Sequence, residues 1–248
     1  MDKSKRITAL KAALAQRILV LDGAMGTAIQ SFDLGPDDFG GPEYEGCNEY
    51  LVVTRPDVIE FIHQGHLDAG ADIIETDTFG AMPIVLSEYS LAHEARRLNR
   101  EAAVIALKAA DAAATPEKPR FVAGSMGPTT KTISVTGGVT FEELADSYHV
   151  QAAGLIEGGA DLLLLETGQD TLNIKAGLEG IDRAFVELGR EIPVAVQGTV
   201  EPMGTLLAGQ DVEALYISLA HRDLLWIGIN CATGPQFMTD HIRTLAGL

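Results

Sequence analysis

Six short runs of apolar residues, each followed by a longer amphipathic segment, constrain the fold of this chain more than any other feature. The runs are ILVLD (18–22), DIIET (72–76), FVAGS (121–125), DLLLLET (161–167), PVAVQGT (193–199) and LLWIGINC (224–231). They are hydrophobic without alternation, which is typical of parallel strands covered on both faces. The sequence therefore predicts an α/β fold, either an open doubly wound sheet or a closed (β/α)8 barrel.

Helix signals lie between these runs. Thr140 and Glu143 have the spacing of a capping box, and Gly70 and Gly158 stand where two amphipathic segments should end. A further helix is expected over residues 4–16, before the first strand. No linker rich in Pro or Ser divides the 248 residues, so we expect one domain.

The charge balance excludes several classes of function. Acidic side chains number 35 against 18 basic ones, for a net charge of -17, which opposes binding to nucleic acid or to anionic membranes. No apolar stretch approaches the roughly 18 residues that a membrane span needs, and the charged N-terminus has no apolar core of a signal peptide. We expect a cytoplasmic protein.

Polar residues cluster at the predicted strand ends, where both candidate folds place their chemistry. They are Asp22, Glu75, Thr76, Thr78, Ser125, Glu166, Thr167, Gln197, Thr199, Asn230 and Cys231. Singly, such residues often cap helices. Together, converging carboxylates without Lys or Arg would require a cationic ligand group or a metal, and an amino acid's ammonium would serve. The glycine-containing turn after Asp22 could hold a carboxylate with its backbone N–H groups.

Two βα units also share a weak repeat. The segments AGADIIET (69–76) and GGADLLLLET (158–167) each contain a glycine, an Ala-Asp pair, an apolar strand and a terminal Glu-Thr. A recurring βα unit is expected in a barrel.

The cysteines and histidines indicate no metal cluster by spacing alone. Cys47 lies in a polar loop segment and is interpreted as incidental, and Cys231 has the common interpretation of a buried core thiol. His63 and His66 are three residues apart on an expected helix and are assigned to its solvent edge. Zinc binding by histidine is not expected.

Several blocks together resemble the homocysteine-binding barrel of cobalamin-dependent methionine synthases. They are LDGAMGTAIQ, CNEYLVVTRPDVIEFIHQGHLDAGADIIETDTFGA, TPEKPRFVAGSMGPTTKT, GGADLLLLETGQDTLNIKAG and GINCATGP. The resemblance covers roughly residues 15–240. Betaine- and S-methylmethionine-dependent homocysteine methyltransferases share some blocks more loosely and are the alternative enzymatic class.

The resemblance implies a (β/α)8 TIM barrel in which zinc, held by three cysteine thiolates, binds the homocysteine sulfur. That thiolate takes a methyl group from methylcobalamin, carried by a separate module, to give methionine. Cys231 matches the first zinc ligand, and Asp22 and Glu166 match the carboxylates that bind the homocysteine ammonium. The backbone at Gly23 and Ala24 would meet the substrate carboxylate, and Thr78 matches a threonine of the amino-acid site.

One part of the family pattern is missing from the sequence. The family's other two zinc ligands lie in a GGCCG segment, which these residues do not contain, nor do they contain cobalamin- or folate-binding modules. We expect about six of the eight βα units in a barrel domain incomplete at its C-terminus. Three interpretations stay open: an enzyme domain unable to act alone, a fragment completed by another chain or by self-association, and a non-catalytic amino-acid-binding module.

Overall fold

The computed structural model describes residues 3–248 and contains one parallel sheet. Its strands are β1 (Ile73–Glu75), β2 (Phe121–Met126), β3 (Leu162–Gly168), β4 (Val194–Gly198) and β5 (Ile227–Ile229). They follow one another in chain order, and every neighbouring pair is parallel. A barrel has this order, whereas a doubly wound sheet reverses direction at a switch point. The predicted barrel-type α/β fold is confirmed.

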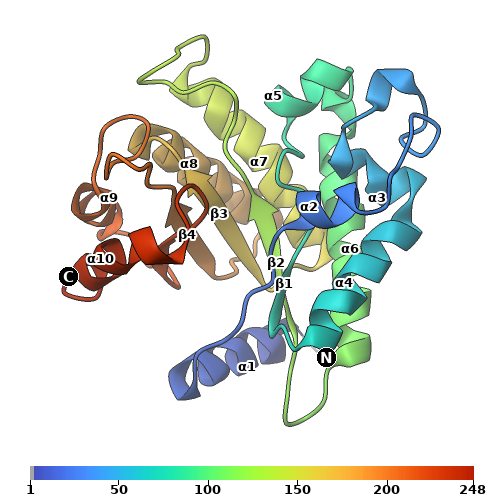
Figure 1. The fold of residues 1–248 in the computed structure, drawn as a ribbon, viewed down its shortest axis with the longest axis horizontal. Helices are drawn as coiled ribbons and strands as arrows, with labels where there is room; N and C mark the ends of the chain where they lie inside the picture. Colours follow the sequence, from blue (N-terminus) through green and yellow to red (C-terminus); the bar gives the residue numbers. More distant parts are fainter. Residues whose placement is uncertain (1–2) are drawn as a thin grey trace.

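Helices surround the sheet, as Figure 1 shows. The longer helices are α1 (Lys3–Gln16), α4 (Pro56–Ala69), α6 (Ala95–Ala113), α7 (Phe141–Gly158), α8 (Thr171–Leu188), α9 (Val212–Leu219) and α10 (Pro235–Leu245), and the short ones are α2 (Met25–Gln30), α3 (Leu51–Thr54) and α5 (Pro83–Leu86). Single 3-10 turns occupy Pro42–Tyr44, Asn48–Tyr50, Ser87–Tyr89 and Ala92–Glu94. The predicted capping box of Thr140 and Glu143 is present at the start of α7, and Gly70 ends α4 in the left-handed conformation. In the described part of the chain, no helix is long and apolar enough to cross a membrane.

The prediction of a strand over residues 18–22 is wrong. The segment runs beside β1 in the parallel direction, but a single bridge joins Leu21 to Ile73. The backbone N–H of Val20 donates to the Asp72 side chain at 2.9 Å instead of to a strand carbonyl. Because the side chain of Asp72 replaces a ladder bond at this position, the segment is no more than an edge bridge.

Both faces of the central strands are buried, which explains their continuous hydrophobicity. Leu163 and Leu165 of β3 pack into the cluster that α7 and α8 cover, whereas Leu162 and Leu164 pack with Leu10 of α1 in another cluster. All four leucines of β3 are at most 2% exposed. The side of the sheet away from the outer helices is therefore filled by apolar side chains and by α1.

The outer helices approach one another closely at glycines. A Cβ on Gly154 of α7 would lie 2.4 Å from the carbonyl oxygen of Arg96, and one on Gly180 of α8 would lie 2.4 Å from that of Ala145. No side chain fits at such distances. The helix layer that supports β2 and β3 is consequently packed backbone against backbone at these crossings.

Arginines fasten the amino ends of the strands. Arg17 donates two hydrogen bonds of 2.7 Å to Asp72, and Arg6 of α1 donates bonds of 2.7 and 2.8 Å to Asp161. Asp72 accepts from Val20 N–H, and Asp161 accepts in the same way from Val122 N–H. The sequence repeat thus has a structural meaning, since in both units its aspartate joins an arginine to the preceding strand segment.

Two side chains are buried more deeply than their sequence context indicates, and the assignment of His63 to a solvent edge is wrong. His63, expected at the solvent edge of α4, is fully buried, and neither ring nitrogen has a hydrogen-bond partner. Desolvation lowers its pKa to about 4, so the buried imidazole is neutral. Cys47, expected in a polar loop, is 1% exposed within an apolar cluster that includes Leu51.

Candidate functional site

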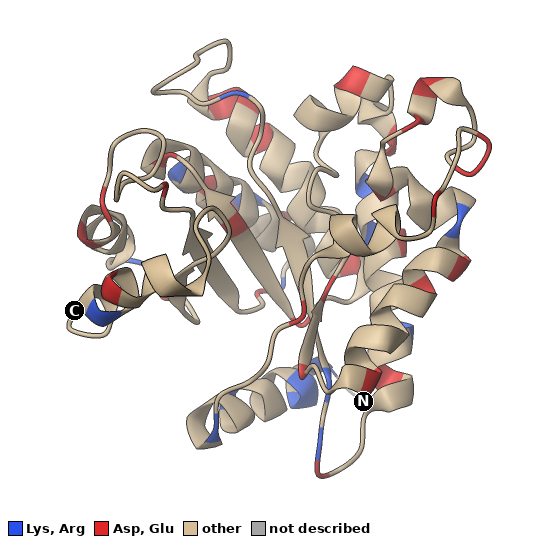
Figure 2. Cartoon of the chain, viewed as in Figure 1, with Lys and Arg blue, Asp and Glu red and all other residues tan. Residues whose placement is uncertain are grey.

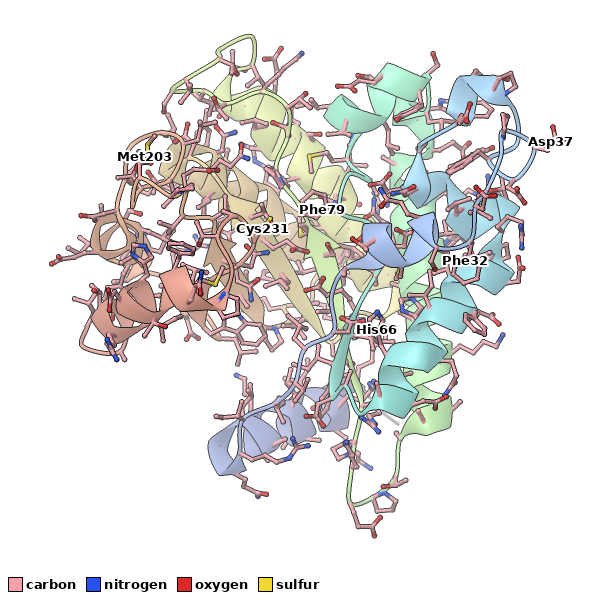
Figure 3. All side chains as sticks on the ribbon, viewed as in Figure 1. Phe32, Asp37, His66, Phe79, Met203 and Cys231 are labelled. Carbon is pink, nitrogen blue, oxygen red and sulfur yellow. The ribbon has the colours of Figure 1, made fainter. Side chains whose placement is uncertain are left out.

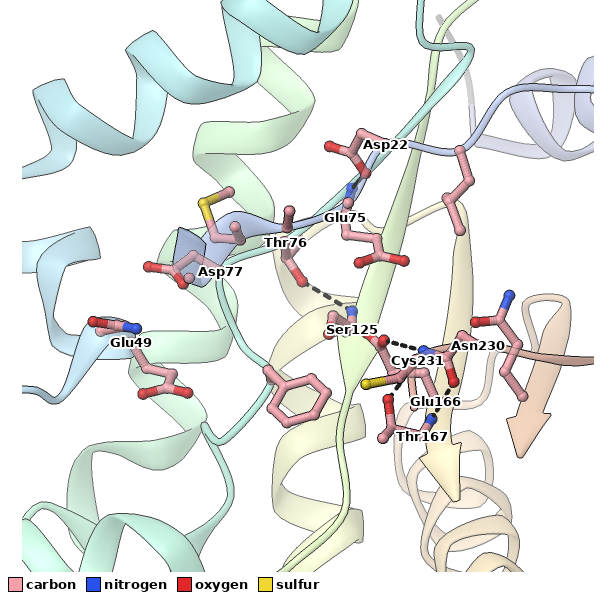
Figure 4. Close-up of a pocket in the computed structure, with 18 residues that line it drawn as sticks. Asp22, Glu49, Glu75, Thr76, Asp77, Ser125, Glu166, Thr167, Asn230 and Cys231 are labelled. Carbon is pink, nitrogen blue, oxygen red and sulfur yellow. Dashed lines mark hydrogen bonds between the residues drawn. The ribbon is translucent and has the colours of Figure 1, made fainter. Parts of the chain in front are cut away.

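A cavity of about 550 Å³ lies at the carboxyl ends of the strands, and Figure 4 shows its lining. The predicted strand-end residues that line it are Asp22, Glu75, Thr76, Ser125, Glu166, Thr167, Gln197, Asn230 and Cys231, together with Gly23 and Ala24 of the following turn. Most of the polar ring expected from the sequence therefore converges on one space. Thr78 and Thr199 are not among its lining residues.

Glu166 is aimed by an irregularity in β3. The register between β3 and β4 shifts between Leu165 and Gly168, and Thr167 has a left-handed φ of 56°. Such bulges redirect a side chain next to a binding site. The Glu166 carboxylate accepts hydrogen bonds from Ser125 Oγ at 2.6 Å and from Asn230 Nδ2 at 3.0 Å. Residues of two other strand ends thereby hold it in place.

Asp22 and Glu75 bring two more carboxyl groups to the same side of the cavity. The backbone N–H of Glu75 donates to Asp22 Oδ1 at 2.8 Å. Burial, followed by the charge of Glu166, raises the pKa of Asp22 to about 7 despite this hydrogen bond. Burial and then the charges of Glu166 and Asp22 raise the pKa of Glu75 well above its usual value. Burial also raises the pKa of Glu166, against the effect of its hydrogen-bond donors.

The raised pKa values of these carboxyl groups have two physical causes, which are burial and the charge of neighbouring acids. No Lys, Arg or His is among the residues that line the cavity in the described chain, so nothing cationic compensates the carboxylates. The loss of water disfavours the charged form of each acid, and the neighbouring acids disfavour it further. A ligand with a positive group would relieve both effects.

The turn after Asp22 presents backbone to the cavity. A Cβ on Gly23 would meet no atom within 4 Å, so this position is open. Ala24 has a left-handed φ of 59° at the start of α2. That conformation is uncommon for a residue with a Cβ and is often found at binding sites.

Cys231 is exposed, so its interpretation as a buried core thiol is wrong. It directly follows Asn230, whose N–H donates to the Gly198 carbonyl and so places Cys231 just beyond the paired end of β5. Cys231 and Ala232 both have left-handed φ values, of 61° and 57°. The reversal brings Cys231 to the lining of the cavity, which also includes Phe79; both residues are labelled in Figure 3.

Thr78 lies behind the cavity wall. It is fully buried, and its hydroxyl donates to the Ser125 carbonyl at 2.6 Å and bonds to the Thr76 hydroxyl at the same distance. Its hydroxyl therefore links the residues at the ends of β1 and β2 and does not line the space between the carboxylates.

Sequence reasoning missed a second group of lining residues, which are Met25, Asn48, Glu49, Asp77 and Phe79. Glu49 comes from a 3-10 turn, and its Oε1 accepts from the Gly80 N–H at 2.7 Å. Asp77 directly follows the apolar run 72–76, and this place after a predicted strand is the sequence signal that could have indicated it. Glu49 carries no comparable sequence signal.

A sequence profile of the homocysteine S-methyltransferase family matches residues 19–248. The chain belongs to the homocysteine S-methyltransferase family. It is 46% identical to methionine synthase of Mycobacterium leprae over 239 residues, and 44% identical to that of Mycobacterium tuberculosis over 245 residues. These alignments cover 96% and 99% of this chain, but the chain spans only about 20% of the length of either relative.

Solved structures support the fold. The metallated form of the homocysteine methyltransferase MmuM from Escherichia coli aligns with a TM-score of 0.77, covering 95% of this chain and 83% of that one, at 23% identity. The apo form of MmuM aligns with a TM-score of 0.71. At this identity the likeness shows a shared fold.

Proposed function

We propose that this chain binds homocysteine for methyl transfer to its sulfur, as the homocysteine-binding part of a methionine synthase. The observation that carries the proposal is the cluster of Asp22, Glu75 and Glu166, which faces the cavity without a cationic side chain. An ammonium placed among them would exchange like-charge repulsion for charge-assisted hydrogen bonds. Family membership and the similarity to mycobacterial methionine synthases support homocysteine as the amino acid.

In this proposal Glu166 is the principal ammonium acceptor. Ser125 and Asn230 already fix its two oxygens, so little conformational entropy is lost when the substrate binds. Asp22 adds a second acceptor. Backbone N–H groups at Gly23 and Ala24 are proposed to face the substrate carboxylate, and the substrate thiol is proposed to lie toward Cys231.

The residues that the structure describes do not complete a zinc site. Among residues 3–248, no group of three or more His, Cys, Asp or Glu side chains is arranged to hold a metal ion. Cys47 is no substitute ligand, because burial raises the pKa of its thiol to about 12 and keeps it protonated. Cys231 alone supplies one thiol, whereas zinc sites ordinarily need three or more protein ligands. If zinc takes part, as the family resemblance implies, we propose that its other ligands and the methylcobalamin-carrying module lie outside these 248 residues.

A betaine donor finds less support in this cavity. Quaternary ammonium groups are typically recognised by several aromatic faces. Of the lining residues that the structure describes, Phe79 alone is aromatic. We therefore favour the cobalamin-dependent reaction over the betaine-dependent one.

Isothermal titration calorimetry with L-homocysteine tests the proposed binding site. Glu166→Gln should weaken binding by about tenfold or more, because a charge-assisted contact to the ammonium is lost. Glu213→Gln, on the exposed face of α9, is the matched control and should bind as the wild type does. Equal affinity of the wild type and Glu166→Gln would contradict the proposal.

A further inference from the structure

Asp77 is a buried acid with no assigned partner, and it lies on the cavity wall. It is 5% exposed, and its Oδ2 atom has no hydrogen-bond partner in the described part of the chain. Figure 4 shows Asp77 and Glu49 on the side of the cavity away from Glu166 and Cys231. A buried polar oxygen without a partner is costly, so a carboxyl group of this kind on a cavity wall is a candidate for a contact with a ligand.

Burial, and then the neighbouring Glu49, favour the protonated form of Asp77. The Gly80 N–H donates to Glu49 Oε1 at 2.7 Å, and a backbone donor favours the ionised carboxylate. Asp77 has no such donor, and no Lys, Arg or His is among the described lining residues. Burial and then the charge of Glu49 raise the pKa of Asp77 well above its usual value. Burial raises the pKa of Glu49 as well, but Glu49 accepts from the Gly80 N–H whereas Asp77 Oδ2 has no donor among the described residues. We therefore place a proton retained by this pair on Asp77, which makes its carboxyl group a hydrogen-bond donor.

An amino-acid ligand has a group that such a donor fits. A zwitterion brings one ammonium and one carboxylate, and the cavity already offers the three carboxyl groups of Asp22, Glu75 and Glu166 for the ammonium. The ligand carboxylate has no cationic side chain to meet among the described lining residues, so only neutral donors can hold it. Backbone N–H groups at Gly23 and Ala24 are two of them, and a protonated Asp77 is a third, from a side chain.

We infer that Asp77 carries a proton and donates it in a hydrogen bond to the α-carboxylate of the bound amino acid. Asp77 is thereby a specificity-determining residue. It favours an amino acid with a thiol side chain, which has an α-carboxylate, over the aminothiol that lacks this carboxylate. This inference rests on the proposed homocysteine site. It assigns opposite tasks to acids in one cavity, since Glu166 binds the ammonium as a carboxylate and Asp77 binds the carboxylate as a neutral acid.

Calorimetry with two probes tests the assignment. L-homocysteine carries the carboxylate, and 3-aminopropane-1-thiol is the same molecule without it. Asp77→Asn keeps a neutral donor and should bind homocysteine within about threefold of the wild type, whereas Asp77→Ala should lose about tenfold. The loss in Asp77→Ala should be confined to homocysteine and be less than about twofold for the aminothiol, which has no group for Asp77 to meet.

A pH series gives an independent result that does not depend on the alanine variant folding. As the pH rises far enough to ionise Asp77, the ratio of wild-type to Asp77→Asn affinity for homocysteine should fall, because an ionised Asp77 would repel the carboxylate while asparagine does not titrate. A ratio that rises with pH would overturn the inference. So would an asparagine variant as weak as the alanine variant, since Asp77 would then act as a carboxylate toward the ammonium.

The Glu166→Gln variant separates this inference from the proposed function. It should weaken both probes, because both contain the ammonium. If the wild type binds neither probe, the proposed function fails and the inference fails with it. If Glu166→Gln behaves as expected while the Asp77 variants do not discriminate between the probes, the inference alone fails.

Discussion

The two ends of the sheet treat buried acids in opposite ways. At the amino ends, Asp72 and Asp161 are 1% and 2% exposed, and each is held by an arginine and by a backbone N–H. At the carboxyl ends, five acids line one cavity without a Lys, Arg or His among the described lining residues. In Figure 2 the Lys and Arg positions of α1 are blue, and they lie at the end of the sheet where the strands begin.

The difference separates stability from binding. An acid that already has its partner stabilises the fold and has nothing left to offer a ligand. A buried acid without a cationic partner destabilises the fold and is available to a ligand, as is common where stability is traded for function. The pKa values follow the same division, since the Arg17 hydrogen bonds lower that of Asp72 whereas burial raises that of Asp22.

The largest expected effect on the free energy of unfolding comes from removing Arg6, one of the arginines at the amino ends of the strands. Arg6→Ala leaves Asp161 buried without its charge partner, and breaking a buried pair in this way costs about 3–5 kcal/mol. Urea unfolding of the variant should show this loss in the free energy of unfolding. Arg183→Ala, which breaks ion pairs only with exposed acids on α7 and α8, should cost no more than about 1 kcal/mol. Equal losses in the two variants would remove the distinction between the two ends.

At the carboxyl ends of the strands, removing a charged side chain should raise the free energy of unfolding instead of lowering it. Asp22→Asn removes a buried negative charge and keeps an oxygen that can accept from Glu75 N–H, so the free energy of unfolding at pH 8 should rise by about 3 kcal/mol. Because the folded pKa of Asp22, about 7, lies above its ordinary value of 3.8, the native state holds a proton that the unfolded state releases between these values. Wild-type stability is therefore lost as the pH rises through this window, and Asp22→Asn should lack that part of the loss. The variant should also bind homocysteine more weakly, and a variant less stable than the wild type at pH 8 would contradict the comparison.

The sequence predicted the elements that depend on local patterns. Continuous apolar runs indicated parallel strands buried on both faces, and the structure has five of them in the expected order. The ring of polar strand ends followed from topology alone, because parallel strands end at one edge. The first run was misjudged, since its short-range pattern does not reveal that Asp72 takes the Val20 N–H.

The remainder of the site depends on tertiary contacts that leave little trace in sequence. Glu49 reaches the cavity because Gly80 N–H holds it, and the hydroxyl of Thr78 is taken by the Ser125 carbonyl, so it does not face the cavity. Cys231 is exposed because the chain reverses in a left-handed conformation directly after β5. A thiol in an apolar sequence segment gives no sign of such a reversal.

The smallest expected effect tests whether the site acids account for the pH dependence of stability. His63 is a buried base whose folded pKa of about 4 lies below its ordinary value of 6.5. The unfolded state therefore binds a proton that the native state excludes, and stability is lost as the pH falls from about 6.5 to 4. His63→Leu replaces the unpartnered ring with an apolar side chain and should remove a loss of about 2 kcal/mol between pH 7.5 and pH 5.

Asp22 and His63 change the free energy of unfolding in opposite directions over overlapping pH ranges. The two contributions therefore partly cancel in the pH profile of the wild type. In Asp22→Asn the decline of stability toward acid pH should become steeper, because the histidine is less opposed. In His63→Leu stability should instead rise more steeply toward acid pH, because the site carboxyls are then less opposed. Chemical denaturation at half-unit pH intervals distinguishes the two slopes. If His63→Leu left the slope unchanged, the imidazole would have to find a partner in solution, and the acids of the cavity would alone govern the response to pH.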